Sequence, residues 1–384
     1  MSDPRAPVII SAAEVPYTRH PDPTLTTTSV LADACRRALD AAGLEPRDVD
    51  GFAVASFSLR PDNAIDLVWR MGLTVEWLLQ DTNGGASGVN MLGHAVNAIR
   101  NDEVSTVLIV SGDAMDPVAS TELSRSYNRV TRDVLWPIGY RGPNALFAML
   151  TQRQMAATGM TRADYGALVT TQRQWATRNP NATYQSPMTI DEYLNAPEVA
   201  SPLHRFDCVP RVSGANAVVV TAASNAPGGS TPIAVKAVRR IANADGQRGD
   251  GLSTGLERIA PKLWNDAGID PGDVSAAFVY DDYPAMVLAQ LSNLGIVDDA
   301  RLPAFVHDHL ATEQFPVNTS GGMLSCGQAG SAGGLHGMVE AVTQLQGNAG
   351  DRQIDAGSNV VVTGYGMVVH RFGAVAGAAV LGAE

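Results

Sequence analysis

The sequence contains few cysteines. Only Cys35, Cys208 and Cys326 occur among 384 residues, at wide intervals. A disulfide framework needs paired cysteines, and a zinc site needs closely spaced Cys or His ligands. His307 and His309 have a spacing that a metal can use, but no Cys or third His stands near them. The sequence therefore predicts neither a disulfide framework nor a metal site.

The chain also lacks an excess of positive charge and a long apolar segment. Its formal net charge is −12, so neither a nucleic acid nor an anionic membrane surface is an expected partner. No run of about 18 apolar residues is present that could span a membrane. The N-terminus, MSDPRAPVII, has no basic region followed by an apolar stretch, which a signal peptide needs. We therefore expect a cytoplasmic protein.

What the chain does contain is an internal repeat. Residues 42–49 are AGLEPRDV and residues 267–274 are AGIDPGDV. Each copy follows a helical pattern and precedes an apolar run that is typical of a buried strand. The glycine suits the left-handed position that ends a helix, and the proline prevents the helix from resuming. The alternative is that this connector of helix, glycine, proline and strand, which is common, arose twice without duplication.

A second repeat occurs in the same order. Residues 104–114 (VSTVLIVSGDA) and 357–367 (GSNVVVTGYGM) are β-branched runs that end in Ser/Thr-Gly. Each follows a helical pattern, over residues 86–100 and 331–346. Apolar strands that alternate with helices predict a mostly parallel sheet covered on both faces. Two repeats in one order favour a duplicated α/β fold.

The stretch between the two halves has a different composition. Residues 115–205 are rich in Arg, Tyr, Asn, Pro and Met. We interpret them as an inserted, mostly helical loop domain. Such insertions often cap the ligand site of an α/β fold.

Six short segments carry a resemblance to a known family. They are RNPNA (178–182), MTIDEYLNAPEVASPLHRFDC (188–208), GANAVVVTAA (214–223), VNTSGG (317–322), LSCGQAGSAGG (324–334) and VTGYG (362–366). Their order and spacing resemble the thiolase superfamily, most of all the sterol-carrier-type thiolases and the related lipid-transfer-protein group. The resemblance covers nearly the whole chain, although Ser213 replaces a commonly found Asp.

The resemblance implies a fold and a substrate class. The fold is α/β, a duplicated thiolase fold with five layers, αβαβα, and an inserted loop domain. It implies an N-terminal thiolase half over residues 1–114 and 206–230, the inserted domain over 115–205, and a C-terminal half over 231–384. The substrate is a coenzyme A thioester, and no cofactor is expected to be bound permanently.

The chain lacks the nucleophile of a thiolase. In that family a Cys-x-x-Gly pattern precedes a buried helix, whose N-terminus favours a thiolate. Here the segment is NGGASGVNM, and counting back from Gly88 puts Gly85 at the nucleophile position. Ser87 would attack only with an adjacent base, which the sequence does not supply. The N–H groups of Gly85, Ala86 and Ser87 are instead expected to bind a thioester oxygen.

The second catalytic position points to a reaction type. YDDYP stands where sterol-carrier-type thiolases have His-Asp-Cys-Phe, so Tyr280 replaces the His and Asp281 is retained. In the lipid-transfer-like aldolases, which this segment resembles, a Tyr-Asp pair cleaves a β-hydroxyacyl-CoA by retro-aldol reaction. The resemblance implies that Tyr280 takes the hydroxyl proton as an acid/base group. The alternative is a tyrosine that merely ends a buried strand with its hydroxyl bonded.

Four further residues are candidates for the site. Gln328 stands at the place of the Gly-His-Pro histidine and can hydrogen-bond an oxyanion, but it cannot carry a proton. Tyr365 lies in the C-terminal loop and is a candidate to reprotonate the enolate. His336 is a candidate substrate-binding residue or a structural part of a helix. Cys326 is either a relocated nucleophile or a small buried side chain.

The favoured function is therefore an acyl-CoA C–C lyase. The alternatives are a thiolase-like acyltransferase and a non-catalytic acyl-CoA-binding or scaffold subunit. The resemblance also implies a homodimer and a separate small partner with a zinc ribbon and an OB-fold. Arg125, Arg129 and Arg173 are candidates for binding the coenzyme A phosphates, or are surface salt-bridge partners.

Overall fold

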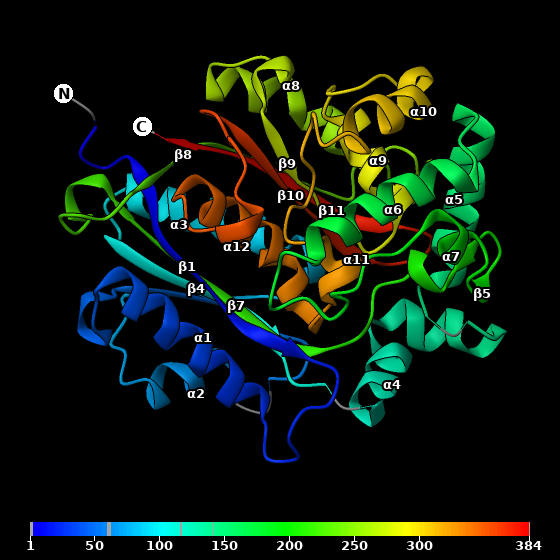
Figure 1. Cartoon of the computed structure of the whole chain (residues 1–384). Helices are drawn as coiled ribbons and strands as arrows, with labels where there is room; N and C mark the ends of the chain where they lie inside the picture. Colours follow the sequence, from blue (N-terminus) through cyan, green and yellow to red (C-terminus); the bar gives the residue numbers. More distant parts are fainter. Residues whose placement is uncertain (1–2, 60–62, 116, 141, 384) are drawn as a thin grey trace.

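A nine-stranded sheet forms the centre of the protein (Figure 1). The computed structural model describes residues 3–59, 63–115, 117–140 and 142–383. The strand order in this sheet is β3-β2-β4-β7-β1-β8-β11-β10-β9. The strands are β1 (Pro7–Thr18), β2 (Gly51–Ala55), β3 (Trp77–Asp81), β4 (Thr106–Asp113), β7 (Ser213–Ala222), β8 (Ile233–Ala242), β9 (Ala276–Phe278), β10 (Val360–Val368) and β11 (Gly373–Ala383). A small second sheet pairs β5 (Glu198–Ala200) with β6 (Leu203–His204).

Helices cover the outer faces of the sheet, and two further helices pack between its two halves. They are α1 (Thr27–Ala42), α2 (Asn63–Arg70), α3 (Ser87–Arg100), α4 (Pro117–Ser126), α5 (Asn144–Thr158), α6 (Arg162–Ala176), α7 (Ile190–Leu194), α8 (Leu256–Ala267), α9 (Pro284–Asn293), α10 (Leu302–Phe305), α11 (Gly322–Cys326) and α12 (Gly333–Leu345). None of the described helices is both long and apolar enough to cross a membrane.

The hydrophobic clusters show five layers. One cluster packs α1 and α2 against one face of β2, β4 and β7. A second packs α3 and α12 between the other face of these strands and the strands β8 to β11. A third packs α8 and α9 on the outer face of that second half. Because α3 and α12 are covered on nearly all sides, they carry apolar or small residues around most of their surface. The predicted αβαβα architecture is confirmed.

The prediction of a mostly parallel sheet is wrong. Among the described strands of this sheet, the pairs β2–β3, β2–β4 and β9–β10 are parallel, whereas β1–β7, β4–β7, β1–β8, β8–β11 and β10–β11 are antiparallel. The strand–helix–strand repeats do make parallel neighbours. The tight turn between β10 and β11 brings the chain back in the opposite direction, because a short connection joins antiparallel strands. Strand β7 returns after the long insertion and also pairs antiparallel with β4.

The internal repeat is visible in the backbone. Gly43 ends α1 and Gly268 ends α8, both in the left-handed region, with φ of 67° and 68°. A short 3₁₀ turn that begins with Pro46 or Pro271 follows, and then β2 or β9 begins. The same local sequence therefore forms the same connection in both halves, as the predicted duplication requires.

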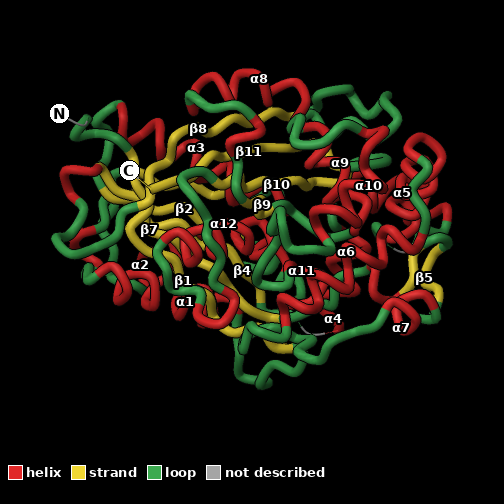
Figure 2. The backbone as a smooth tube through the Cα atoms, turned by 45° about the horizontal axis from the view of Figure 1, so that its top comes forward, coloured by secondary structure: helices red, strands yellow, loops and turns green. Residues whose placement is uncertain are grey.

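The helices α4 to α7 lie together at one end of the molecule (Figures 1 and 2). All four fall within residues 115–205, and most of this segment is helical or irregular. Asn128 donates from Nδ2 to the backbone oxygen of Val368, 2.6 Å away, which ties the insertion to the end of β10. The exact division of the chain into three domains stays a prediction.

Candidate active site

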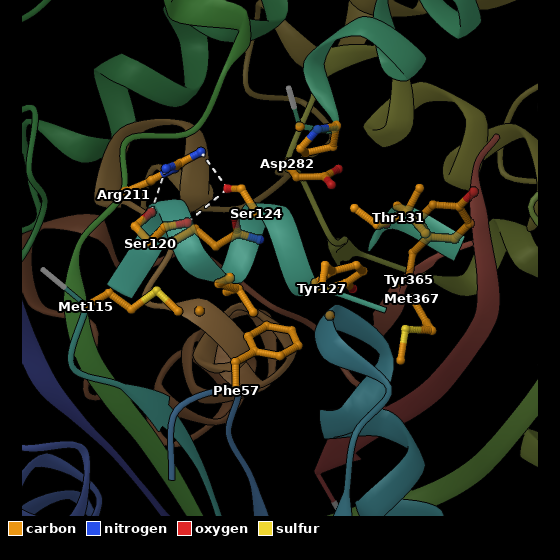
Figure 3. Close-up of a pocket in the computed structure, with 18 of the residues that line it drawn as sticks. Phe57, Met115, Ser120, Ser124, Tyr127, Thr131, Arg211, Asp282, Tyr365 and Met367 are labelled. Carbon is orange, nitrogen blue, oxygen red and sulfur yellow. Dashed lines mark hydrogen bonds between the residues drawn. The ribbon is translucent and has the colours of Figure 1, made fainter. Parts of the chain in front are cut away.

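A cavity of about 150 Å³ lies between the insertion and the ends of the central strands. Segments from both halves and from the insertion meet there (Figure 3). Its lining includes aromatic and small side chains, one carboxyl and one guanidinium group. The lining residues are Phe57, Gly85, Met115, Ser120, Leu123, Ser124, Tyr127, Thr131, Tyr140, Gly142, Pro143, Arg211, Tyr280, Asp282, Gln328, Gly330, Tyr365, Gly366, Met367 and Val368. Four of the predicted site residues, Gly85, Tyr280, Gln328 and Tyr365, are brought together by the fold.

Tyr280 is held by its backbone just after the end of β9. Its N–H donates to Thr363 Oγ1 at 3.0 Å, and its carbonyl oxygen accepts from Gln290 Nε2 at 2.6 Å. The preceding Val279 exchanges two hydrogen bonds with the side chain of Asn318, at 2.8 and 2.9 Å. These side chains replace strand partners, so the segment stays extended although the strand has ended. The hydroxyl of Tyr280 is thereby fixed at the cavity.

Gln328 contacts that hydroxyl directly. Its Nε2 donates to Tyr280 Oη at 2.6 Å. The loop that carries it is anchored by hydrogen bonds from Gln328 N to Pro210 O, at 2.8 Å, and from Val212 N to Gln328 O, at 3.3 Å. Burial, and then the nearby Asp282, raise the pKa of Tyr280 well above its ordinary value. At neutral pH the phenol therefore keeps its proton, accepts from Gln328 and has one proton to donate.

Gly85 packs directly against Tyr280. A Cβ atom built on Gly85 would overlap the Tyr280 ring and the backbone oxygen of Tyr365. The two neighbouring candidates do not line the cavity. The N–H of Ala86 donates to Asn83 O at 3.2 Å, and the hydroxyl of Ser87 donates to Asp81 at 2.6 Å. Of the three predicted oxyanion-binding residues, only Gly85 is at the cavity.

Asp281 and Asp282 face opposite sides of their segment. Asp282 lines the cavity together with Tyr280, and Asp281 does not. Asp281 accepts from the N–H groups of Met323, at 2.9 Å, and Leu324, at 3.4 Å. Burial raises the pKa of Asp281 to about 7. Asp281 is absent from the cavity lining and anchors α11, whereas Asp282 lines the cavity.

Tyr365 contributes its ring to the cavity wall. Its hydroxyl accepts from the N–H of Gly373 at 2.7 Å, across the turn between β10 and β11. Burial raises the pKa of Tyr365. The hydroxyl is thus occupied by the backbone on its acceptor side, and its role in reprotonation stays a prediction.

Cys326 and His336 lie together, away from the cavity. Cys326 Sγ donates to Ser320 O at 3.1 Å, and His336 Nε2 is 2.8 Å from Ser320 Oγ. His336 Nδ1 lies 3.2 Å from a carboxylate oxygen of Glu14 and 3.3 Å from the hydroxyl of Tyr17. Burial raises the pKa of the Cys326 thiol. Neither side chain lines this cavity, although His336 borders a separate small pocket together with Tyr280 and Asp281.

The coenzyme A phosphate candidates are also placed elsewhere. Arg173 is buried, donates from Nε to Ser325 Oγ at 3.0 Å and stacks on Tyr184. Arg129 lies 3.9 Å from Asp133 on the surface. Neither these two nor Arg125 line the cavity.

Three residues at the cavity were missed by the sequence reasoning (Figure 3). Asp282 directly follows the predicted pair Tyr280 and Asp281 and is not among the predicted site residues. Tyr127, whose hydroxyl bonds the backbone of residues 367 and 368, comes from the insertion and carries no sequence signal. Arg211 at the rim donates to Ser120 Oγ at 2.5 Å and to Ser124 Oγ at 3.4 Å.

Comparisons with known proteins agree with this architecture. Residues 241–379 match the family model of thiolase C-terminal domain-like proteins. A 17-hydroxy-3-oxo-4-pregnene-20-carboxyl-CoA lyase of Mycobacterium tuberculosis is 28% identical over 83% of this chain and 86% of its own. A steroid side-chain-cleaving aldolase of Thermomonospora curvata is 28% identical over 88% of this chain and 91% of its own. The solved structure of an Ltp2-ChsH2(DUF35) aldolase superposes with a TM-score of 0.81 at 24% identity, over 99% of this chain and 98% of that one.

Proposed function

Because the chain is a thiolase-like protein of the sterol-carrier and lipid-transfer type, we propose that it is an acyl-CoA C–C lyase. It cleaves a β-hydroxyacyl-CoA by retro-aldol reaction and uses no cysteine nucleophile. The observation that carries the proposal is the hydrogen bond between Gln328 and the Tyr280 hydroxyl, at a cavity where Gly85 replaces the thiolate.

The arrangement of residues at the cavity suits a reaction through an enolate better than a reaction through an acyl-enzyme. A thiolase needs a nucleophile that becomes acylated, and Gly85 has no side chain. A retro-aldol cleavage needs a hydrogen-bond donor for the thioester oxygen, because negative charge develops there as the C–C bond breaks. The protonated Tyr280, oriented by Gln328, is such a donor.

The relatives support the same reaction class. The lyase and the aldolase that resemble this chain over most of its length are named for the cleavage of steroid side chains or of a CoA ester. We extend to this chain only the broader class, a β-hydroxyacyl-CoA whose β-carbon bears a ring or a branch. Arg211 at the cavity rim supplies a positive charge for an anionic part of such a substrate.

The proposed enzyme is a cytoplasmic homodimer. The edge strand β3 exposes Leu78, and the preceding helix α2 exposes Ile65 and Trp69. An unpaired strand edge beside exposed apolar side chains favours pairing with a second copy. We retain a separate small zinc-ribbon/OB-fold protein as a proposed partner, because one structure of the same fold is an aldolase named for two components, Ltp2 and ChsH2(DUF35).

The reaction is tested with purified protein and a panel of CoA esters. β-Hydroxyacyl-CoA and β-ketoacyl-CoA esters are incubated with the protein, with and without a co-purifying small partner, and the products are followed by mass spectrometry. We expect a ketone or aldehyde and a shortened acyl-CoA from the β-hydroxy esters. Tyr280→Phe removes the donor and should lower the rate about 10²- to 10³-fold, as loss of an oxyanion donor does elsewhere.

Tyr283→Phe is the matched control. Tyr283 lies on the same segment, but its hydroxyl bonds Asn144 and it does not line the cavity. Loss of the Tyr283 hydroxyl should leave most of the cleavage rate unchanged. Thiolysis of the β-keto esters by free coenzyme A, unaffected by Tyr280→Phe, would contradict the lyase proposal.

A further inference from the structure

We propose that the carboxylate of Asp282 is the base that takes the β-hydroxyl proton of the substrate. This role rests on the proposed lyase function. It assigns to Asp282 the proton transfer that the sequence assigned to Tyr280.

Asp282 lines the cavity, and one of its carboxylate oxygens has no hydrogen-bond partner among the described residues. It lines the cavity beside Tyr280, and Figure 3 shows it with Tyr127 and Tyr365 around the same space. The backbone N–H groups of Asp282 and Tyr283 bond its carboxylate, but its Oδ1 is shielded from solvent and has no hydrogen-bond partner among the described residues. Buried polar atoms in native proteins are nearly always bonded. An unbonded carboxylate oxygen at a cavity therefore indicates a ligand group that donates to it.

Among the described residues, the titratable groups that interact with this carboxyl group are a carboxyl, phenols and a thiol, and none is a cation. They come from the segment after β9, the insertion, the segment before β7 and β10: Tyr127, Tyr280, Asp281, Tyr283, Tyr365 and Cys208. Burial, and then Asp281, raise the pKa of Asp282 well above its ordinary value. A carboxylate with a raised pKa is a stronger base than an ordinary one, and it holds a proton more readily once it has taken it.

Tyr280 and Asp282 then have opposite tasks. Active sites that need both an acid and a base often hold two titratable groups in different environments, so that one group keeps its proton and the other accepts one. Tyr280 keeps its proton and donates to the thioester oxygen, since its acceptor side is occupied by Gln328. The Oδ1 of Asp282 has no bonded donor among the described residues.

The proposed step balances without an added reagent. Asp282 takes the hydroxyl proton, and the O–H electron pair forms the carbonyl of the released ketone or aldehyde. The Cα–Cβ bond breaks, and its electron pair moves into the thioester enolate. The protonated Asp282 then returns the proton to the α-carbon, which yields the shortened acyl-CoA and restores the carboxylate.

The test compares Asp282→Asn with Asp282→Glu in the full-length protein, over a range of pH, with the β-hydroxyacyl-CoA that the wild type cleaves best. We expect Asp282→Asn to lower kcat about 10²- to 10⁴-fold with little change in KM. The wild-type rate should rise with pH as Asp282 ionises, and this rise should be absent in Asp282→Asn. Asp282→Glu, which keeps a carboxylate, should retain part of kcat and also the rise of the rate with pH.

Asp281→Asn provides the comparison on the opposite side of the segment. It should lower the melting temperature, because it disturbs the anchor of α11, and keep the pH-dependent rise. A wild type that cleaves its substrate no faster than Asp282→Asn, with the same pH profile, would overturn the role of Asp282 and leave the lyase function standing. A wild type that cleaves no β-hydroxy ester would overturn the lyase function and this role with it. Circular dichroism of each variant shows that a lost rate does not reflect an unfolded protein.

Discussion

At the scale of single residues, Gly85 and Tyr280 depend on each other. The Tyr280 ring occupies the space that any side chain at position 85 would need. A cysteine nucleophile at 85 and a tyrosine at 280 in its present position are therefore sterically incompatible. The loss of the thiolate and the presence of the tyrosine are one structural change, and not two independent ones.

This dependence predicts that Gly85→Ala destabilises the protein. The added methyl group overlaps the Tyr280 ring and the Tyr365 backbone, and overpacking of this kind typically costs about 1–3 kcal/mol. The free energy of unfolding, measured in urea, should fall accordingly. Gly272→Ala is the control, because Gly272 has open space around its Cα and no positive φ. An equal effect of both substitutions would show that the contact with Tyr280 is not the cause.

At the scale of elements, one carboxylate joins two loops that border the cavity. Asp113, at the end of β4, accepts from the N–H groups of Phe57 and Ser58 at 2.8 Å, and from the N–H of Ser331 at 2.8 Å. The first loop carries Phe57 into the cavity wall, and the second follows Gln328 directly. Asp113 therefore sets the distance between the aromatic wall and the loop that orients Tyr280.

Asp113→Ala should destabilise the fold and loosen the cavity together. Each buried donor left without an acceptor costs about 1–3 kcal/mol, so the loss of unfolding free energy should be about 3 kcal/mol or more. KM for the CoA ester should also rise, because the loop that carries Phe57 is released. Asp133→Ala, which removes an exposed carboxylate, serves as the control. Asp113→Ala with unchanged stability and KM would contradict the proposed clamp.

At the scale of the whole molecule, the exposed edge strand predicts a dimer. Leu78 on β3 is 43% exposed and Trp69 on α2 is 74% exposed. Leu78→Lys puts a charge into the proposed interface, and burying an unpaired charge is unfavourable. Size-exclusion chromatography with light scattering should show the wild type as a dimer and Leu78→Lys shifted to the monomer.

Val199→Lys is the control for the dimer. Val199 is 47% exposed, similar to Leu78, but it lies on β5 of the small second sheet. It should leave the oligomeric state unchanged. A wild type that is monomeric at all concentrations would contradict the dimer.

The sequence by itself determined the duplication, the order of helices and strands, and the resemblance to thiolases. These features depend on local signals, such as the glycine and proline after α1 and α8, which act within a few residues of the chain. It also placed Gly85, Tyr280, Gln328 and Tyr365 at one site by resemblance, and the structure brings all four to one cavity.

Only the tertiary structure decided which side chains face that cavity. Asp281 and Asp282 are neighbours of the same type, yet Asp282 lines the cavity and Asp281 instead bonds the backbone of Met323 and Leu324, from a distant part of the chain. The antiparallel pairings, the entry of Tyr127 from the insertion and the distance of Cys326 from Tyr280 likewise depend on long-range packing. Burial by that packing also raises the pKa of Tyr280, so the phenol keeps its proton for donation.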